Sequence, residues 1–244
     1  CRAMRPKNHS SGKLNSSISP IKKPMRMREQ TSGHRAKPTH SLQAQKAQAT
    51  RERIIDAVIK IINESGLSAA SASTITSRAG ITWGAVQHHF GSKNDILQAI
   101  LELAYAVYLT RINDPALHRG DLATRIDNYV DTIWAHYKSD LYFAFQEILL
   151  AHRDRLTALD LHSFRPVEAN ALHLEWLYDC CAHSEDNEYK ISQTIRFAHR
   201  FMAGFAVDRT LEPKMPFERE HLATLKGFLN TQLAADNLVF QAPH

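Results

Sequence analysis

The chain has 244 residues, of which 43% are hydrophobic and 23% are charged, and its formal net charge is +5. This is the composition of a globular protein, so it excludes a chain that is disordered throughout. No apolar run approaches the roughly 18 residues that cross a bilayer, so we expect neither a membrane-spanning segment nor a membrane partner. Three cysteines (Cys1, Cys180 and Cys181) cannot build a disulfide framework, which predicts a reducing, cytoplasmic location.

The charge is distributed unevenly along the chain. Residues 1–49 hold 11 Lys and Arg but one acid, Glu29, and so carry a net charge of +10. Residues 50–104 are neutral, with five charges of each sign, and residues 105–244 carry −5, from 14 basic and 19 acidic side chains. A basic end on an acidic body indicates a polyanionic partner at that end.

Residues 1–45 are rich in Ser, Lys, Arg and Pro and have almost no large apolar side chains. Such a segment cannot bury enough surface to offset its ordering entropy, so we expect a disordered tail. Its composition fits a transit peptide, a solvated extension, or an arm that attracts phosphates. The chain opens at Cys1, and Met4, Met25 or Met27 could equally be a natural start.

An amphipathic helix is predicted over residues 48–64, followed by two short helices. Ser65-Gly66 should end the first helix, and Gly66 suits a left-handed position after it. Ser71 can cap the second helix and Thr82 the third, with Gly80 permitting the sharp turn between them. Two short helices joined by a glycine-containing turn are typical of a helix-turn-helix. The apolar side chains of the first helix are Ile54, Ile55, Ala57, Val58, Ile61 and Ile62.

The segment Ala79-Gly-Ile-Thr-Trp-Gly-Ala-Val-Gln-His-His-Phe-Gly-Ser-Lys93 resembles the DNA-binding domain of the tetracycline-repressor (TetR) family. The resemblance covers residues 50–97. It implies an all-α protein with a three-helix DNA-binding domain at 46–92 and a helical ligand-binding and dimerisation domain at 93–244. Two positions depart from the family pattern: Gln87 stands where Tyr is common, and Thr76 where Ala is common.

The third helix would lie in the major groove as the recognition helix. Gln87 could pair with an adenine edge, Trp83 could pack on sugar or thymine methyl groups, and Gly84 leaves room for close approach. Ser71 and Thr82 cap their helices whether or not they also hold phosphate. The family resemblance implies a phosphate contact for Lys93. The complete predicted DNA-binding set is Ser71, Thr82, Trp83, Gly84, Gln87, His88 and Lys93.

From Lys93 onward the apolar spacing is helical and no strand-like alternation competes with it. The pattern predicts helices over residues 93–112, 122–137, 141–152, 164–181, 189–211 and 217–238. In TetR-like proteins the last two long helices pair with a partner subunit. The residues that could form this surface, or simply face the core of one chain, are Ile195, Phe201, Phe205, Leu222, Leu225, Phe228 and Leu229.

A ligand pocket should fall between the middle helices, where aromatic walls suit a small apolar or aromatic effector. Residues of these types more often form plain core than contact a ligand, and the candidates for the lining are Trp134, Tyr137, Phe145, Leu149, His173, Trp176 and Phe201. Adjacent His88 and His89 diverge on a helix, and the other histidines lack ligand spacing, so we expect no metal and no cofactor. Cys180 and Cys181 fit buried small residues better than a redox pair.

These features favour a dimeric transcriptional regulator that acts as a repressor. Its partners would be a near-palindromic double-stranded DNA operator, a second copy of itself, and a small effector that releases the DNA. An activator, or a regulator of the same fold that answers no ligand, remains an alternative. From another class, the basic tail could drive non-specific nucleic-acid binding. The sequence has no GxSxG, P-loop or GxGxxG motif, so we expect no enzyme.

Overall fold

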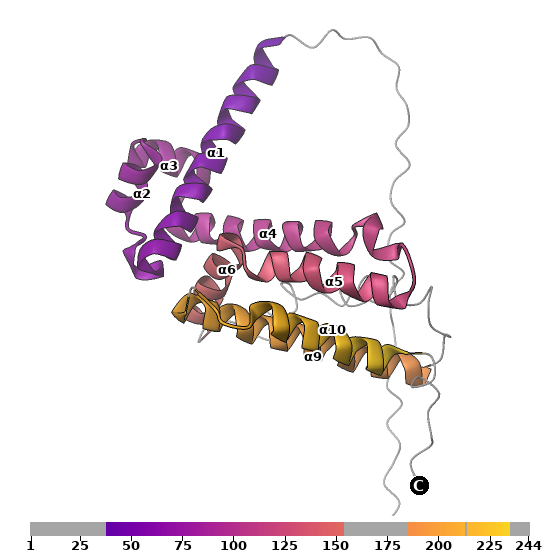
Figure 1. Ribbon diagram of the computed structural model, residues 1–244. Coiled ribbons are helices and arrows are strands. Elements are labelled where there is room, and N and C mark those ends of the chain that lie inside the picture. The colour runs from indigo at the N-terminus through magenta and orange to yellow at the C-terminus, as the bar shows by residue number, and fades with distance from the viewer. Residues whose placement is uncertain (1–37, 154–184, 213, 235–244) are drawn as a thin grey trace, which may run out of the picture.

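The computed structural model describes residues 38–153, 185–212 and 214–234, and every regular element within them is a helix (Figure 1). The predicted all-α fold is therefore confirmed. The DNA-binding part and its connection comprise α1 (Pro38–Ser65), the 3₁₀ turn η1 (Leu67–Ala69), α2 (Ala72–Ala79), α3 (Trp83–Phe90) and α4 (Lys93–Ile112). The rest comprises the 3₁₀ turn η2 (Pro115–His118), α5 (Leu122–Tyr137), α6 (Asp140–Ala151), α9 (Glu185–Leu211) and α10 (Glu218–Leu233).

The first helix is longer than the sequence pattern predicted. It begins at Pro38, so the expectation of a disordered tail up to residue 45 is wrong for its last eight residues. Proline is favoured in the first turn of a helix, where its missing N–H costs no hydrogen bond. Residues 42–49 are Ala, Gln, Leu and Lys, which are good helix formers, and all of them are exposed. Propensity, not burial, therefore explains this extension.

The other helix boundaries follow local signals closely. The helices α4 and α5 begin and end where the apolar spacing predicted. Ser92 and Asp95 form a capping box, in which the Ser92 backbone N–H donates to Asp95 Oδ2 at 2.8 Å. Asp121 caps α5 by accepting from the Thr124 backbone N–H at 2.9 Å. The helix predicted over residues 164–181, like residues 1–37, lies outside the described part of the chain.

Two hydrophobic clusters organise the described residues. The first, here called the N-terminal core, gathers α1, α2 and α3 with the beginning of α4 and with α6; Ile54, Ile62 and Ile75 are fully buried in it. The second, the body core, joins the end of α4 with α5, α9 and α10; Tyr129 and Ile133 are fully buried there. Each cluster excludes water from one group of helices, and this burial holds the group together.

The helix α4 belongs to both clusters. Its first half buries Ile96 and Ile100 in the N-terminal core, and its last turn buries Ile112 in the body core. In α6, Ile148 lies in the N-terminal core and Tyr142 in the body core. The residues that open the predicted ligand-binding domain at 93 thus pack with the DNA-binding domain.

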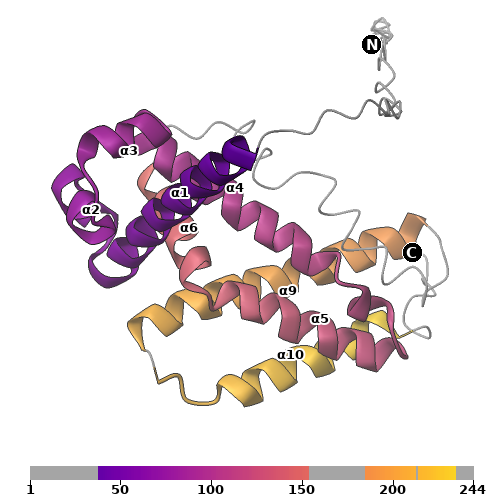
Figure 2. The ribbon, with the colours of Figure 1, turned by 90° about the horizontal axis from the view of Figure 1, so that it is seen from above.

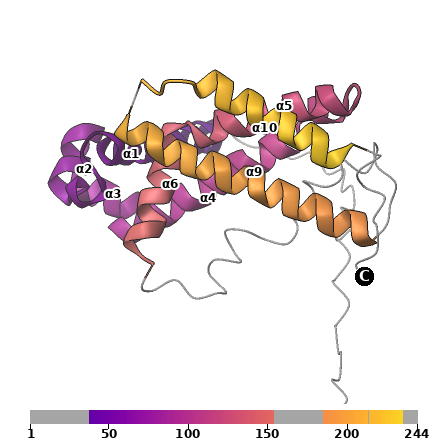
Figure 3. The ribbon, with the colours of Figure 1, turned by 60° about the horizontal axis from the view of Figure 1, so that its bottom comes forward.

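The body is a layer of long helices beneath α1–α3. Figure 2 shows α4 and α5 crossing the molecule, and Figure 3 shows α9 and α10 side by side over α5. Trp134 on α5 stacks on Phe205 of α9, with ring centroids 5.1 Å apart. In the described helices we find none both long and apolar enough to cross a membrane.

Because α4 belongs to both cores, we expect its buried residue Ile100 to stabilise the N-terminal core. Ile100 is fully buried, so Ile100→Ala should lower the free energy of unfolding by about 2–5 kcal/mol through lost burial and a residual cavity. The matched control is Leu103→Ala on the same helix, where 37% of the residue is exposed and the loss should stay within about 0.5 kcal/mol. Denaturant unfolding of both variants measures the difference, and equal losses would contradict the packing described.

Candidate functional site

The helices α2 and α3 form a compact helix-turn-helix whose geometry is fixed by short-range capping. Ser71 accepts from the Thr74 backbone N–H at 3.2 Å, and Thr82 accepts from the Ala85 backbone N–H at the same distance. Gly80 ends α2 in the left-handed conformation, with φ 63° and ψ 39°. A Cβ added there would meet no atom within 4 Å, so the dihedral angles alone favour glycine. The predicted caps and turn are thus confirmed.

One side of α3 is buried and the other is open to solvent. Val86 is buried in the N-terminal core, and Phe90 and Trp83 pack half-buried against it. Trp83, which the sequence predicts to contact DNA, packs partly on the core, so only part of its ring is open to a partner. The exposed side of α3 and its cap holds Thr82, Gly84, Gln87 and His88. Four small or hydrogen-bonding residues are therefore available to a partner.

A cation from α1 fixes the end of α3. The Arg51 guanidinium donates a hydrogen bond to the carbonyl oxygen of His89 and lies over the Phe90 ring, 4.0 Å from its centroid. The last carbonyls of a helix have no partner within the helix and carry partial negative charge, so a guanidinium stabilises them. Arg51 therefore positions α3 on α1 although it lies outside the helix-turn-helix itself.

An ion pair joins α1 to α2. Arg78 donates to both carboxylate oxygens of Glu64, with Nη1 2.8 Å from Oε1. These hydrogen bonds lower the pKa of the Glu64 carboxyl and raise that of Arg78. Both side chains are solvent-exposed, so we assign the pair a role in orientation and little stability.

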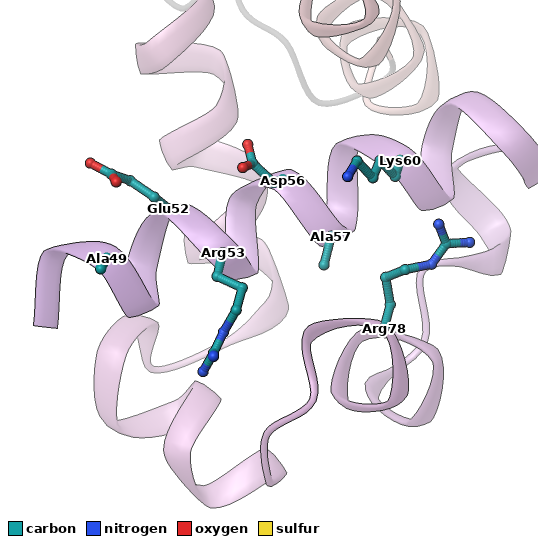
Figure 4. Close-up of a pocket in the computed structure, with 7 residues that line it drawn as sticks. All are labelled: Ala49, Glu52, Arg53, Asp56, Ala57, Lys60 and Arg78. Carbon is teal, nitrogen blue, oxygen red and sulfur yellow. The ribbon is translucent and has the colours of Figure 1, made fainter. Parts of the chain in front are cut away.

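An open groove of about 310 Å³ lies beside this pair, between α1 and α2 (Figure 4). Figure 4 shows Arg78 reaching from α2 towards α1, with Arg53 projecting from α1 on the same side. The groove also carries carboxylates, so its charge is mixed. Its lining is Ala49, Glu52, Arg53, Asp56, Ala57, Lys60 and Arg78.

Three helix N-termini carry the residues predicted to hold phosphate. Ser71 and Thr82 are exposed at the starts of α2 and α3, and half-buried Lys93 is the first residue of α4. Free backbone N–H groups and the helix dipole make such termini suited to anions.

Comparison with known proteins shows which family this domain resembles. Residues 54–100 match the family model described as "Bacterial regulatory proteins, tetR family". The regulator SrpR of Pseudomonas putida is 45% identical over 58 residues, covering 24% of this chain and 27% of its own. The regulator AcrR of Shigella flexneri is 38% identical over 60 residues, covering 25% and 28%. The regulator BetI of Escherichia coli is 36% identical over 86 residues, covering 33% and 43%.

Solved structures extend the likeness in fold beyond this domain. A TetR-family regulator from Marinobacter aquaeolei matches with a TM-score of 0.57 at 14% identity, covering 78% of this chain and 97% of its own. A transcriptional regulator from Rhodococcus matches with a TM-score of 0.55 at 21% identity, covering 75% and 93%.

Residues 54–100 therefore form a DNA-binding domain of the TetR type. The sequence matches span between 27% and 43% of the three curated relatives' lengths, so they bear on the DNA-binding part, while only the fold likeness reaches the body.

The body of this chain contains a buried polar and aromatic cluster. His199 on α9 bridges two tyrosines of α5: Tyr129 Oη lies 2.7 Å from its Nε2, and Tyr137 Oη lies 2.8 Å from its Nδ1. Tyr129 is fully buried, and its burial raises the pKa of the phenol well above the usual value. A neutral imidazole can donate to one hydroxyl and accept from the other, so this bridge needs no charge.

His136 lies next to this bridge with a different environment. It is 4% exposed, and its Nδ1 has no hydrogen-bond partner. Burial, aided by the charge of Arg111, lowers the pKa of His136 to about 4, so the ring is neutral at pH 7. Nε of Arg111 is likewise buried without a hydrogen-bond partner. Sequence reasoning missed Arg111, because a basic residue in the last turn of a helix usually interacts with the helix dipole and with solvent.

The predicted pocket residues fall into two aromatic groups. Tyr137 contacts Tyr142 with ring centroids 4.5 Å apart, and Tyr142 contacts Phe145 with ring centroids 5.9 Å apart. Trp134 and Phe201 both contact Phe205, and Trp134 Nε1 donates to Glu218 at 2.9 Å. Leu149 does not join them, because it packs against the N-terminal core. His173 and Trp176 lie outside the described residues.

The predicted dimer surface needs correction. Ile195, Phe205, Leu225 and Leu229 are buried in the body core of a single chain, and Phe201 and Leu222 pack half-buried against it. They face inward because α5 covers that side of α9 and α10. Phe228 is 38% exposed and contacts Phe197, which is 48% exposed and which sequence reasoning missed. Within the described residues, we find no cluster of His, Cys, Asp and Glu that could hold a metal ion.

The contact of Arg51 with α3 predicts a local effect on the recognition helix. Arg51→Met should speed amide hydrogen exchange in the last turn of α3 by on the order of tenfold, since a charge-assisted hydrogen bond and a cation–π contact are lost. Exposed Arg53→Met, on the same helix, is the matched control and should leave α3 exchange unchanged. Unchanged exchange in both variants, measured without DNA, would show that Arg51 does not position α3.

Proposed function

We propose that this protein is a dimeric, sequence-specific transcriptional regulator that binds a near-palindromic DNA operator. The observation that carries the proposal is the clamped recognition helix: one side of α3 is fixed by Val86 and Arg51, while Gln87 and His88 remain exposed on the other. A rigid helix that offers hydrogen-bonding side chains is what base-edge recognition in the major groove requires. The family relatives bear the names of transcriptional regulators, which supports the same function.

The base contact in this proposal is Gln87. A glutamine amide can donate to and accept from an adenine edge at once, and Gln87 is exposed on α3. His88 and Thr82 flank it, and the N-termini at Ser71 and Lys93 would hold phosphates on either side. Gly84 has no side chain to keep the backbone from the DNA.

The dimer surface in this proposal is the outer side of α9 and α10. Phe197 and Phe228 lie with ring centroids 4.9 Å apart, one on each helix, and both are exposed in the single chain. Exposed aromatic pairs are typical of interfaces. A two-fold pairing of this face would present two recognition helices to two operator half-sites.

The regulator acts as a repressor in this proposal, and an effector bound in the body lowers its affinity for the operator. The aromatic cluster beside His199 would line the effector site. An activator of the same fold shares all the described features except the sign of regulation. A non-specific binder driven by the basic tail would be indifferent to the residue at position 87, which separates it from the regulator.

If Gln87 contacts a base, replacing it should lower the affinity for the specific operator but not for random DNA. For an operator selected from random DNA, Gln87→Ala should weaken binding by about 5- to 150-fold, the value of one bidentate base contact. Gln98→Ala, an exposed glutamine on α4, is the matched control and should bind as the unsubstituted protein does. Fluorescence anisotropy at fixed salt measures both. An equal loss on selected and random DNA would contradict a base contact at Gln87.

The aromatic pair predicts the oligomeric state. The double variant Phe197→Glu, Phe228→Glu should dissociate the dimer, because each phenylalanine contributes about 1.5–3 kcal/mol of burial and occurs twice in a two-fold interface. Leu103→Glu places the same charge on an exposed leucine of α4 and should remain dimeric. Sedimentation velocity distinguishes the species, and a double variant that stays dimeric would place the interface elsewhere.

A further inference from the structure

Two polar atoms stand out in the body because both are buried and neither has a hydrogen-bond partner among the described residues. They are Nε of Arg111, at the end of α4, and Nδ1 of His136, on α5. A buried polar atom without a partner destabilises the fold, and more so when the group is charged. Native structures contain few such atoms, and each calls for an explanation such as a missing partner.

The two groups are electrostatic neighbours, since the Arg111 charge contributes to the lowered pKa of His136. No carboxylate in the described residues forms an ion pair with either of them. The Arg111 side chain is partly exposed, but its Nε is buried and it has no counter-ion among the described residues, so it attracts a single negative charge. One carboxylate matches it, whereas a phosphate near charge −2 would leave an excess.

Aromatic rings from three helices surround His136. The ring centroid of His136 lies 5.3 Å from that of Tyr108 on α4, 5.9 Å from that of Tyr137 on α5 and 5.3 Å from that of Tyr142 on α6. His199 on α9 contacts both Tyr108 and Tyr137. The titratable and charged groups that face His136 are thus one arginine, three phenols and, behind them, one imidazole.

We propose that Arg111 and His136 hold the acidic group of the effector, which is therefore a small organic carboxylate with an apolar body that contacts the tyrosine rings. One carboxylate oxygen accepts from Arg111 Nε–H, and the other accepts from His136 Nδ1–H. The inference rests on the proposed effector-responsive function and replaces the largely apolar ligand that the sequence predicted.

Proton uptake accompanies binding. A carboxylate beside His136 favours the charged imidazole and so raises its pKa above the value of about 4 in the free protein. Because the complex then binds more protons than the free protein, the affinity for the carboxylate rises as the pH falls from 7.5 to 5.5. A bound water could satisfy the same two atoms, but it would give no preference for negative charge.

The test compares each carboxylate with its neutral amide: acetate with acetamide, benzoate with benzamide, and phenylacetate with phenylacetamide. Binding to the full chain is measured by calorimetry at fixed salt. We expect at least one carboxylate to bind about tenfold more tightly than its amide, which corresponds to one charge-assisted hydrogen bond. Arg111→Met should bring the two affinities within about twofold, while exposed Arg119→Met should keep the difference. His136→Gln should remove the pH dependence of the affinity.

The proposal is overturned if no carboxylate exceeds its amide, as a water-filled site predicts, or if the preference survives in Arg111→Met. Arg111→Met replaces a partly exposed side chain, which has no ion pair among the described residues, with an apolar chain of similar length, so it should fold. An NMR titration of His136 in the unsubstituted protein gives an independent measurement: the carboxylate that binds most tightly of the three should raise its pKa, and an unchanged pKa would overturn the proposal. Operator binding is measured separately without any carboxylate, so its absence would refute the regulator and leave the carboxylate site standing.

Discussion

The helix α4 is the constraint on which the rest of the structure depends. Twenty residues of α-helix extend about 30 Å, and this helix is buried at both of its ends in different cores. Ile96 and Ile100 tie its first half to the helices that carry the recognition helix, while Ile112 ties its last turn to the body. A rigid rod fixed in two cores cannot shift at one end without moving the packing at the other.

This arrangement gives the proposed regulation a physical route. Arg111 lies one residue before the end of α4, and the capping box of Ser92 and Asp95 lies at its other end, directly after α3. An effector that binds Arg111 would bias the position of α4, and α4 contacts both α1 and α3. Coupling between two sites requires an element whose position both of them influence. In the proposed regulation, α4 is that element.

The buried polar groups of the body differ in whether their hydrogen bonds are satisfied. Tyr129, Tyr137 and His199 satisfy one another, so their network is complete and orients α5 against α9. Arg111 and His136 are incomplete in the same interior. A complete network has a structural role by itself, whereas the incomplete one has no partner among the described residues and is the basis of the proposed ligand site.

The sequence by itself determined the features that depend on a few neighbouring residues. The caps Ser71, Thr82 and Ser92 were predictable because each binds a backbone N–H three residues further along, and Gly80 because its turn needs a left-handed conformation. The lengths of α4 and α5 followed from the spacing of their apolar residues. The part of α1 that precedes residue 48 was not predicted, because helix propensity without an apolar pattern is a weak signal.

Only the tertiary structure decided which surfaces are buried. The helices α9 and α10 carry apolar residues on more than one side, so spacing could not tell that Ile195 and Leu229 face α5 while Phe197 and Phe228 face outward. Arg111 and His136 lie 25 positions apart on different helices, and their shared burial arises from the crossing of α4 with α5. Contacts of this kind depend on how helices pack, and no spacing along one helix encodes them.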